Sequence, residues 1–404
     1  MRGILYTTLA LASSLSISTS IACTDFRVAA KDGTQVIARS MEFAMPLNSD
    51  IISIPRGTAY GNTAPDGKPS MSWKSKYGYV MVDGLKQVFT IDGMNEAGLS
   101  FEYLYLPGFT QYQTVPAGKD NQAIPYFYFG DWVLGNFKSV DEVRQALANV
   151  YVYSQTLPAI GEMVFPLHAA IHDASGKGIV VEFINGQMQI SDYVGVMTNA
   201  PTYQWHVQNL PQYLNLSPYN PKPVIANGIS YGANGEGAGM IGLPGDISPA
   251  SRFTKIAFML QYAYQVENAT SAVNLAEHII NNVDIPAGIA RANNNGQETY
   301  ETTEWTVFKD LTHKVFYYHT YQDLTLRSVD LKQVDFSEKA PKLVMPLSSA
   351  PTVLDVTGKF KLSFMQTKAD VPTPAAAPAL TVAPTSAAAL APAADPTPAT
   401  EPKN

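Results

Sequence analysis

The stretch Phe26-Arg27-Val28-Ala29-Ala30-Lys31-Asp32-Gly33-Thr34-Gln35-Val36-Ile37-Ala38-Arg39 holds two short runs of β-forming residues on either side of Asp32-Gly33. A run of this kind, a turn dipeptide and a second run are typical of antiparallel strands. The pattern returns at residues 79–82 and 88–91, with further turn signals at Asp66-Gly67 and Asp92-Gly93. Residues 23 to about 173 therefore predict antiparallel sheet.

The order of the later elements predicts the fold class. Ser139-Val140-Asp141-Glu142 has the spacing of a capping box and predicts a helix to about residue 149. Residues 167–183 predict a hairpin around Ser175-Gly176, residues 248–264 and 269–283 predict longer helices, and residues 300–334 return to strands. Strands, then helices, then strands again favour an α+β layered fold over a repeating βαβ fold.

The composition is that of a soluble globular protein with a large core, since 46% of the 404 residues are hydrophobic and 15% are charged. The net charge is −7, from 34 acidic and 27 basic residues without a long run of either sign, which argues against nucleic acid as a partner. A single cysteine, Cys23, excludes a disulfide framework within the chain, a CxxC redox pair and a thiolate-rich zinc site.

The two ends of the chain differ from the rest in composition. Arg2, a mostly apolar stretch over residues 4–17 and the small-x-small triplet Ser20-Ile21-Ala22 predict a signal peptide over residues 1–22, and its apolar run is too short for a stable membrane span. The protein is then expected to be exported to the periplasm or secreted after removal of the signal peptide. Residues 23–368 form the predicted domain, and the Ala, Pro and Thr of residues 369–404 predict a disordered tail.

Several motifs match known sites by letter alone. Gly228-Ile229-Ser230-Tyr231-Gly232 fits a serine hydrolase elbow, but residues 233–237 will not begin the helix that an elbow requires. Residues 237–242 match a dinucleotide fingerprint, but Pro244 and Gly245 end its helix, so we interpret them as a glycine-rich loop. His168 and His172 would share one face of a strand without an evident third ligand, so we predict neither a metal nor a cofactor.

Removal of the signal peptide would make Cys23 the first residue. Its thiol can then act as a nucleophile while its own α-amino group, with a reference pKa of about 7.7–8.0, takes and returns the proton. Two alternatives stay open at this point. Cys23 can carry a lipid in a membrane-anchored, non-catalytic binding protein, although Ser20 is poor for a lipobox, or it can pair with a histidine as a Cys–His dyad.

An ordered set of motifs runs along the chain: Cys23-Thr24, Ala38-Arg39-Ser40-Met41-Glu42, Asp92-Gly93-Met94-Asn95-Glu96-Ala97-Gly98-Leu99, Met197-Thr198-Asn199-Ala200-Pro201-Thr202, Gly242-Leu243-Pro244-Gly245-Asp246 and Ser251-Arg252-Phe253. This set resembles the choloylglycine hydrolase family, the N-terminal-nucleophile enzymes that include bile salt hydrolases and penicillin V acylases. The resemblance covers residues 23 to about 334. It implies a four-layer αββα fold, hydrolysis of a small linear amide through a thioester, no cofactor and assembly as a homotetramer.

Three of the site residues that this resemblance implies lie near the start of the chain. Cys23 would be the nucleophile and its amine the base. Arg39 would lie beside the sulfur, where a fixed positive charge favours thiolate. Glu42 stands where the family more often has Asp, and its carboxylate would orient the α-amino group.

The other implied site residues concern the oxyanion and the substrate. The side-chain amide of Asn199 and the backbone N–H of Tyr105 would donate to the tetrahedral oxyanion. Arg252 would complete the positive charge of the pocket. Because Tyr105 matches the aromatic residue of penicillin V acylases rather than the Asn of bile salt hydrolases, a flat or aliphatic acyl group is expected. Penicillin V-like amides, N-acyl homoserine lactones and conjugated bile acids are the candidate substrates.

Overall fold

The computed structural model describes residues 22–157, 163–294, 296–348 and 350–360. The chain divides after Thr352 into two units, Met1–Thr352 and Val353–Asn404. In the second unit the described residues 353–360 include one 3₁₀ helix, η7 (Thr357–Lys359). The predicted signal peptide, apart from Ala22, the domain end at residue 368 and the tail over residues 369–404 lie outside the described residues.

The hairpin predicted from the opening stretch is present at the centre of a first sheet, which we call sheet A. Strands β1 (Cys23–Ala29) and β2 (Gln35–Phe43) pair antiparallel, and their turn contains Gly33 at a φ of +91°, which glycine adopts without strain. In the described part of the chain sheet A has seven strands, in the order β14 (Val196–Met197), β1, β2, β18 (Gln297–Asp310), β19 (Val315–Thr320) and β20 (Asp323–Asp330), with β17 (Ala290–Asn294) also pairing with β18.

A second antiparallel sheet, sheet B, has eight strands among the described residues. Its order is β13 (Gln187–Asp192), β12 (Gly178–Ile184), β11 (Leu167–Asp173), β8 (Leu99–Tyr105), β7 (Gln87–Asn95), β6 (Tyr79–Gly84), β3 (Asp50–Ile54) and β21 (Leu343–Pro346). Short pairs are formed by β4 (Ala59–Tyr60) with β5 (Trp73–Lys74), β9 (Ala123–Pro125) with β10 (Tyr151–Tyr153), and β15 (Val224–Ala226) with β16 (Ile229–Tyr231).

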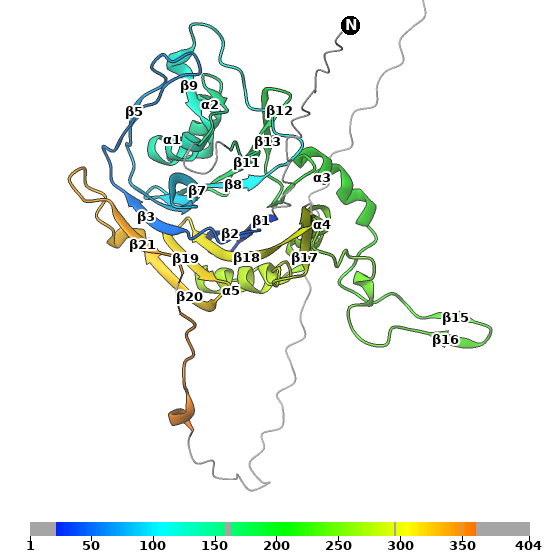
Figure 1. Cartoon of the computed structure of the whole chain (residues 1–404). Coiled ribbons are helices and arrows are strands. Elements are labelled where there is room, and N and C mark those ends of the chain that lie inside the picture. The colour runs from blue at the N-terminus through cyan, green and yellow to red at the C-terminus, as the bar shows by residue number, and fades with distance from the viewer. Residues whose placement is uncertain (1–21, 158–162, 295, 349, 361–404) are drawn as a thin grey trace, which may run out of the picture. The chain divides into compact units, whose positions relative to one another are not determined.

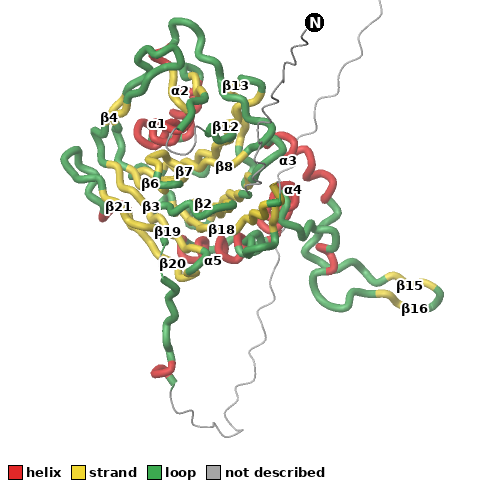
Figure 2. The backbone as a smooth tube through the Cα atoms, in the orientation of Figure 1, coloured by secondary structure: helices red, strands yellow, loops and turns green. Residues whose placement is uncertain are grey.

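Helices cover the outer face of each sheet. Helices α4 (Pro249–Tyr262) and α5 (Ala269–Ile280) pack on sheet A, and α1 (Phe129–Asn136) and α2 (Val140–Leu147) pack on sheet B (Figure 1). Figure 2 shows the two layers of strands lying face to face between these helices. This is the predicted α+β fold with four αββα layers.

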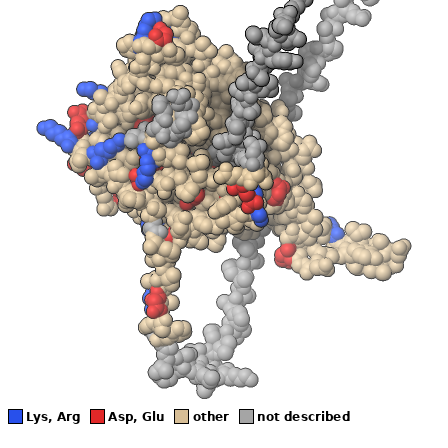
Figure 3. Space-filling view, in the orientation of Figure 1, with Lys and Arg blue, Asp and Glu red and all other residues tan. Residues whose placement is uncertain are grey.

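The remaining helices are short. They are α3 (Tyr203–Asn209) and the 3₁₀ helices η1 (Asp120–Gln122), η2 (Tyr126–Tyr128), η4 (Leu210–Tyr213), η5 (Ala238–Met240) and η6 (Leu331–Gln333). The described part of the chain contains no helix with the length and apolar character needed to cross a bilayer. On the face drawn in Figure 3, basic and acidic side chains are interspersed on a surface that is mostly uncharged.

Most of the predicted elements are confirmed. Helix α2 begins after Ser139, whose side chain accepts a hydrogen bond from the Glu142 N–H, and it ends two residues before the predicted boundary. The hairpin over residues 167–183 corresponds to β11 and β12, the two longer helices to α4 and α5, and the late strands to β18, β19 and β20.

The turn predicted at Asp92-Gly93 is wrong, because both residues lie inside strand β7. Position 93 requires glycine because helix α1 and strand β6 approach it closely. A Cβ there would lie 2.7 Å from Leu134 Cδ1 and 2.7 Å from the Val80 carbonyl oxygen. Helix α1 itself was not predicted. Its residues are almost all buried, so they lack the alternation of apolar and polar positions that marks a surface helix.

Gly93→Ala is expected to lower the free energy of unfolding by about 1–3 kcal/mol, because the new methyl group must displace backbone or a packed leucine. Urea unfolding of both proteins measures the difference. Gly235→Ala is the matched control, since nothing lies within 4 Å of a Cβ at that position. Equal stability of Gly93→Ala and wild type would contradict the close approach of α1.

Candidate active site

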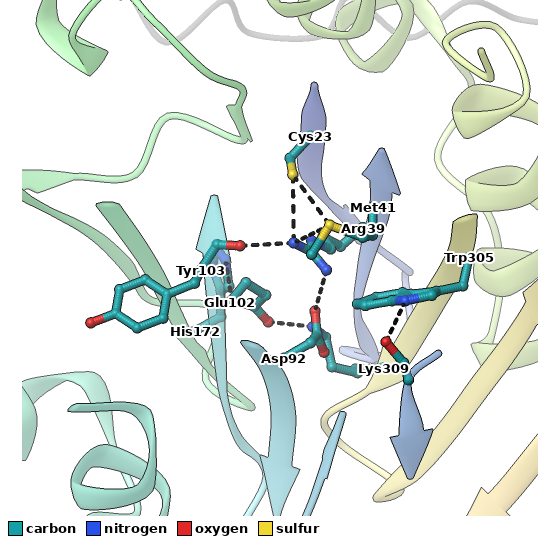
Figure 4. Close-up of polar contacts among 10 residues, drawn as sticks. Cys23, Arg39, Met41, Asp92, Glu102, Tyr103, His172, Trp305 and Lys309 are labelled. Atoms are coloured by element: carbon teal, nitrogen blue, oxygen red, sulfur yellow. Dashed lines mark hydrogen bonds and ion pairs between the residues drawn. The ribbon is translucent and has the colours of Figure 1, made fainter. Parts of the chain in front are cut away.

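Cys23 begins β1 in the interior of sheet A, and its side chain is only 1% exposed. The register pairs Cys23 with Met41 and Asp25 with Arg39, so alternation puts these side chains on the face toward sheet B. Cys23 Sγ lies 3.6 Å from Arg39 Nη2 and 3.8 Å from Met41 Sδ (Figure 4). Burial raises the pKa of the Cys23 thiol, and the Arg39 charge opposes that effect.

Arg39 is wholly buried between the two sheets. Its Nη2 donates to the Tyr103 carbonyl oxygen at 2.7 Å, and its guanidinium lies 4.7 Å from the centre of the Trp305 ring. Its Nη1 lies 3.9 Å from Asp92 Oδ2. The residue therefore lies beside the sulfur, with an aromatic face and one carboxylate as further neighbours.

Asn199 lies just after β14 and joins several segments of the site. Its side-chain Oδ1 accepts from the Cys23 backbone N–H at 2.6 Å and from Arg252 Nη2 at 2.7 Å. Its Nδ2 donates to the carbonyl oxygen of Tyr105 at 2.9 Å. The structure thus brings Asn199 and Tyr105 together, although this contact uses the carbonyl of Tyr105 and not its N–H.

Arg252 lies in the first turn of α4 and is completely buried, not on the surface as a helix-start arginine usually is. Its Nη1 donates to the Cys23 carbonyl oxygen at 2.6 Å and to Thr24 Oγ1 at 2.5 Å, and its Nε donates to the Ile247 carbonyl oxygen at 2.9 Å. Arg252 therefore fixes the first residues of β1 from the helix side of sheet A.

Glu42, which is expected to orient the Cys23 amine, contacts strand β18 through its carboxyl group. Its Oε1 accepts from Thr303 Oγ1 at 3.0 Å, whereas the Cys23 N–H donates to Asn199. In the chain described here Ala22 is still joined to Cys23, so this nitrogen is a peptide nitrogen and not an amine. Burial raises the pKa of the Glu42 carboxyl to about 7, against the opposing charge of Arg252.

Two histidines hold consecutive carbonyl groups of the segment that carries Asn199. His206 Nε2 lies 2.8 Å from the Asn199 carbonyl oxygen, and His168 Nε2 lies 3.0 Å from that of Thr198. His206 also stacks on Phe253 at 4.8 Å between ring centres. Sequence reasoning missed these roles, because a histidine that bonds to a backbone carbonyl leaves no residue-type signature.

His168 and His172 share a face of β11, as predicted, but they have different partners. His168 Nδ1 contacts Glu182, whereas His172 Nε2 lies 3.2 Å from Asp25 Oδ1 and 3.6 Å from Glu102 Oε2. Donor atoms of Asp25, Glu102 and His172 lie within 4.8 Å of one another, close enough to meet at one ion. Because the Lys309 ammonium already lies 2.5 Å from Glu102, we assign no metal to them.

An apolar pocket opens beside the sulfur. Its wall is made only of apolar and aromatic residues besides Cys23, and it includes Met41, Phe43, Leu85, Phe89, Tyr105 and Phe165. The sulfur therefore lies where a polar cluster meets an apolar cavity. An apolar group held in this pocket would lie next to the thiol.

The two glycine-rich motifs lie elsewhere. Ser230 is exposed on β16, in a hairpin that extends away from the two sheets, so it has no elbow geometry (Figure 1). Residues 237–242 contain only the three-residue η5 and form a loop, as interpreted. Neither motif contributes to the site around Cys23.

Comparison with known proteins agrees with this geometry. Residues 23–344 match the model of "Linear amide C-N hydrolases, choloylglycine hydrolase family". The chain belongs to the choloylglycine hydrolase family. It is therefore a hydrolase of linear amide C–N bonds.

Its relatives include enzymes with two different names. A "Bile salt hydrolase/transferase" of Clostridium perfringens is 35% identical over 325 residues, which is 77% of this chain and 93% of the relative. A "Penicillin V acylase" of Pectobacterium atrosepticum is 26% identical over 350 residues, 81% of this chain and 86% of the relative. A solved variant of conjugated bile acid hydrolase from Clostridium perfringens is 30% identical, with a TM-score of 0.73 over 83% of this chain and all of that one.

The buried His206 predicts a pH dependence of stability. Burial lowers its pKa from 6.5 to about 4, so between these values the unfolded chain takes up a proton that the folded protein refuses. Its contribution is complete above pH 6.5 and is lost as the pH falls toward 4, by about 3 kcal/mol in all. His206→Gln should therefore lose less thermal stability than wild type between pH 7 and about pH 4.5.

Thermal unfolding at several pH values measures this difference. His278→Gln, at an exposed position of α5, serves as the control and should keep the wild-type slope. If stability falls with pH as steeply in His206→Gln as in wild type, folding does not lower the pKa of His206.

Proposed function

We propose that this chain is an exported amidohydrolase whose nucleophile is the Cys23 thiol, freed at the N-terminus by cleavage after Ala22. The observation that supports it most directly is the position of Cys23 Sγ at the junction of the apolar pocket and the Arg39 guanidinium. The side-chain amide of Asn199 and the guanidinium of Arg252 both form hydrogen bonds with the backbone of Cys23. A thiol, a fixed cation and amide donors in one place are suited to acyl transfer.

The proposed reaction proceeds in two stages. The α-amino group takes the thiol proton as the thiolate attacks the amide carbonyl carbon, and the oxyanion accepts hydrogen bonds from Asn199 Nδ2 and the Tyr105 N–H. Collapse to a thioester breaks the C–N bond, and the α-amino group of Cys23 passes its proton to the leaving amine. Water, activated by the α-amino group of Cys23, then attacks the thioester, which releases the carboxylic acid and restores the thiol. The residues themselves perform each step, so no cofactor or metal is needed.

In this mechanism Asn199 must turn its amide from the Tyr105 carbonyl to the substrate oxyanion. Removal of the residues before Cys23 would convert its peptide N–H into an amine with more than one proton. The buried Glu42 carboxylate would then orient that amine, with Thr303 holding its other side. The extra methylene of Glu42, compared with the family's Asp, lets it keep the Thr303 contact.

The apolar wall of the pocket limits the substrate to amides with an apolar acyl group. The Tyr105 ring forms part of that wall and favours a flat or aliphatic acyl group over a bulky steroid. Penicillin V-like amides are thus the first candidates, followed by N-acyl homoserine lactones. Conjugated bile acids stay in the set because of the relatives named as bile salt hydrolases.

Export and assembly belong to the same proposal. The signal-peptide pattern of residues 1–22 supports a periplasmic or secreted enzyme, and an anchored protein lipidated on Cys23 is the alternative. The hairpin β15–β16 exposes four large apolar side chains away from the sheets, which supports packing against another copy in a homotetramer: Val224, Ile225, Ile229 and Tyr231. Light scattering measures the oligomeric state.

Cys23→Ala should abolish amide hydrolysis, because methyl cannot attack a carbonyl carbon, while the protein stays folded. Penicillin V hydrolysis is followed by chromatography, and intact mass shows whether the exported wild type begins at Cys23 with an unmodified thiol. Wild type with residues 1–22 retained should also be inactive, since its Cys23 nitrogen is an amide. Turnover by Cys23→Ala would remove Cys23 from the mechanism, and a diacylglyceryl adduct would support the lipid-anchored alternative.

Tyr105→Asn should shift selectivity and leave the chemical step largely intact, because it keeps the backbone N–H and removes a ring from the pocket. The lost apolar contact amounts to about 1–3 kcal/mol for an aromatic acyl group. The ratio of kcat/KM for penicillin V to that for glycocholate should therefore fall. An unchanged ratio would show that the ring does not contact the acyl group.

A further inference from the structure

Two carboxylates lie directly opposite each other in the interior of sheet B. Asp92 on β7 pairs in register with Glu102 on β8, and both are completely buried. Like charges in this position destabilise a sheet. Lys309 reaches them from β18 of sheet A, with its Nζ 2.7 Å from Asp92 Oδ1 and 2.5 Å from Glu102 Oε1 (Figure 4). The lysine therefore places one positive charge between the two carboxylates from the facing sheet.

The other oxygen of Asp92 faces Arg39. Asp92 Oδ2 and Arg39 Nη1 are 3.9 Å apart, and neither atom has a hydrogen-bond partner. A carboxylate and a guanidinium gain most when they form two parallel hydrogen bonds. Such closure would draw the guanidinium away from Cys23 Sγ and the Tyr103 carbonyl, which its Nη2 now contacts.

We propose that Lys309 is a positioning residue. By binding Oδ1 of Asp92, it prevents that carboxylate from forming a two-bond ion pair with Arg39, so the Arg39 guanidinium stays beside the Cys23 sulfur. The inference deepens the proposed function and rests on the role of Cys23 as nucleophile. Lys309 itself does not touch the sulfur or the apolar pocket. It acts through Asp92 and Arg39.

The groups around this chain of contacts support the assignment. On the far side of Glu102, His172 Nε2 lies 3.6 Å from Oε2, and the Tyr193 hydroxyl and His172 both contact Asp25 Oδ1. Burial favours a neutral Lys309, but its carboxylate neighbours more than offset this and raise its pKa, so the ammonium is charged at neutral pH. Glu42 and Arg252 are the remaining charges near the thiol.

The test measures ionisation of the thiol, which does not depend on amidase activity. Cys23 is the single cysteine of the chain, so alkylation by iodoacetamide, followed by intact mass between pH 5 and 10, reports on this thiol alone. Lys309→Met keeps the length of the side chain and removes its charge. We expect the midpoint of its alkylation profile to rise by about one pH unit, and the rate at pH 7 to fall about tenfold.

Removing the competing carboxylate should have the opposite effect. Asp92→Asn should move the midpoint below that of wild type. The double variant Lys309→Met/Asp92→Asn should recover at least the wild-type rate at pH 7, because Arg39 then has no carboxylate to capture it. A residue that only stabilised the fold would give additive damage. Lys332→Met, an exposed lysine on η6, is the matched control and should leave the profile unchanged.

The proposal is overturned if Lys309→Met alkylates with the wild-type midpoint, or if the double variant stays as slow as Lys309→Met. If Lys309→Met does not fold, Asp92→Asn decides: a lowered midpoint supports the proposal, and an unchanged or raised one overturns it. Failure of the proposed function would show separately, as a wild type whose thiol titrates as described but hydrolyses none of the amides.

Discussion

The guanidinium of Arg39 is wholly out of water, and its contacts come from both sheets. The Cys23 sulfur and the Trp305 ring belong to sheet A, whereas the Tyr103 carbonyl and the Asp92 carboxylate belong to sheet B. A buried cation is tolerated only while its acceptors and counter-charges stay in place. The two sheets therefore cannot slide past each other without exposing an unmatched charge. The contacts of Arg39 thus add to the apolar core in holding the two sheets in their relative position.

This arrangement separates the chemistry from the selectivity. Cys23 and Arg39 lie on paired strands in the interior of a sheet, where the backbone has little freedom. The pocket wall, by contrast, takes Leu85 from the turn between β6 and β7 and Phe165 from the segment before β11. Loops of this kind vary without disturbing the scaffold. The different enzyme names of its relatives are consistent with that division.

The sequence allowed much of the architecture to be predicted, because alternation in the opening hairpin and the cap at Ser139 are local signals. The same local signal led to a wrong turn prediction at Asp92-Gly93. In sequence this dipeptide is the same whether it forms a turn or whether, as here, the glycine permits close packing of α1 and the aspartate forms a buried ion pair. The implied residues Arg39, Asn199 and Arg252 lie together around Cys23, but only their motif order pointed to them. His206 and Lys309 were not found, since their partners are 7 and 217 residues away along the chain and no local pattern records such pairing.

The position of Cys23 inside sheet A also has a temporal consequence. Its backbone nitrogen bonds to Asn199, 176 residues away, and its carbonyl oxygen bonds to Arg252, 229 residues away. Contacts of such high contact order form late. In the completed fold the bond between Ala22 and Cys23 is buried, beyond the reach of a processing peptidase. A peptidase that cuts between Ala22 and Cys23 would therefore have to act before these long-range contacts close around the first strand.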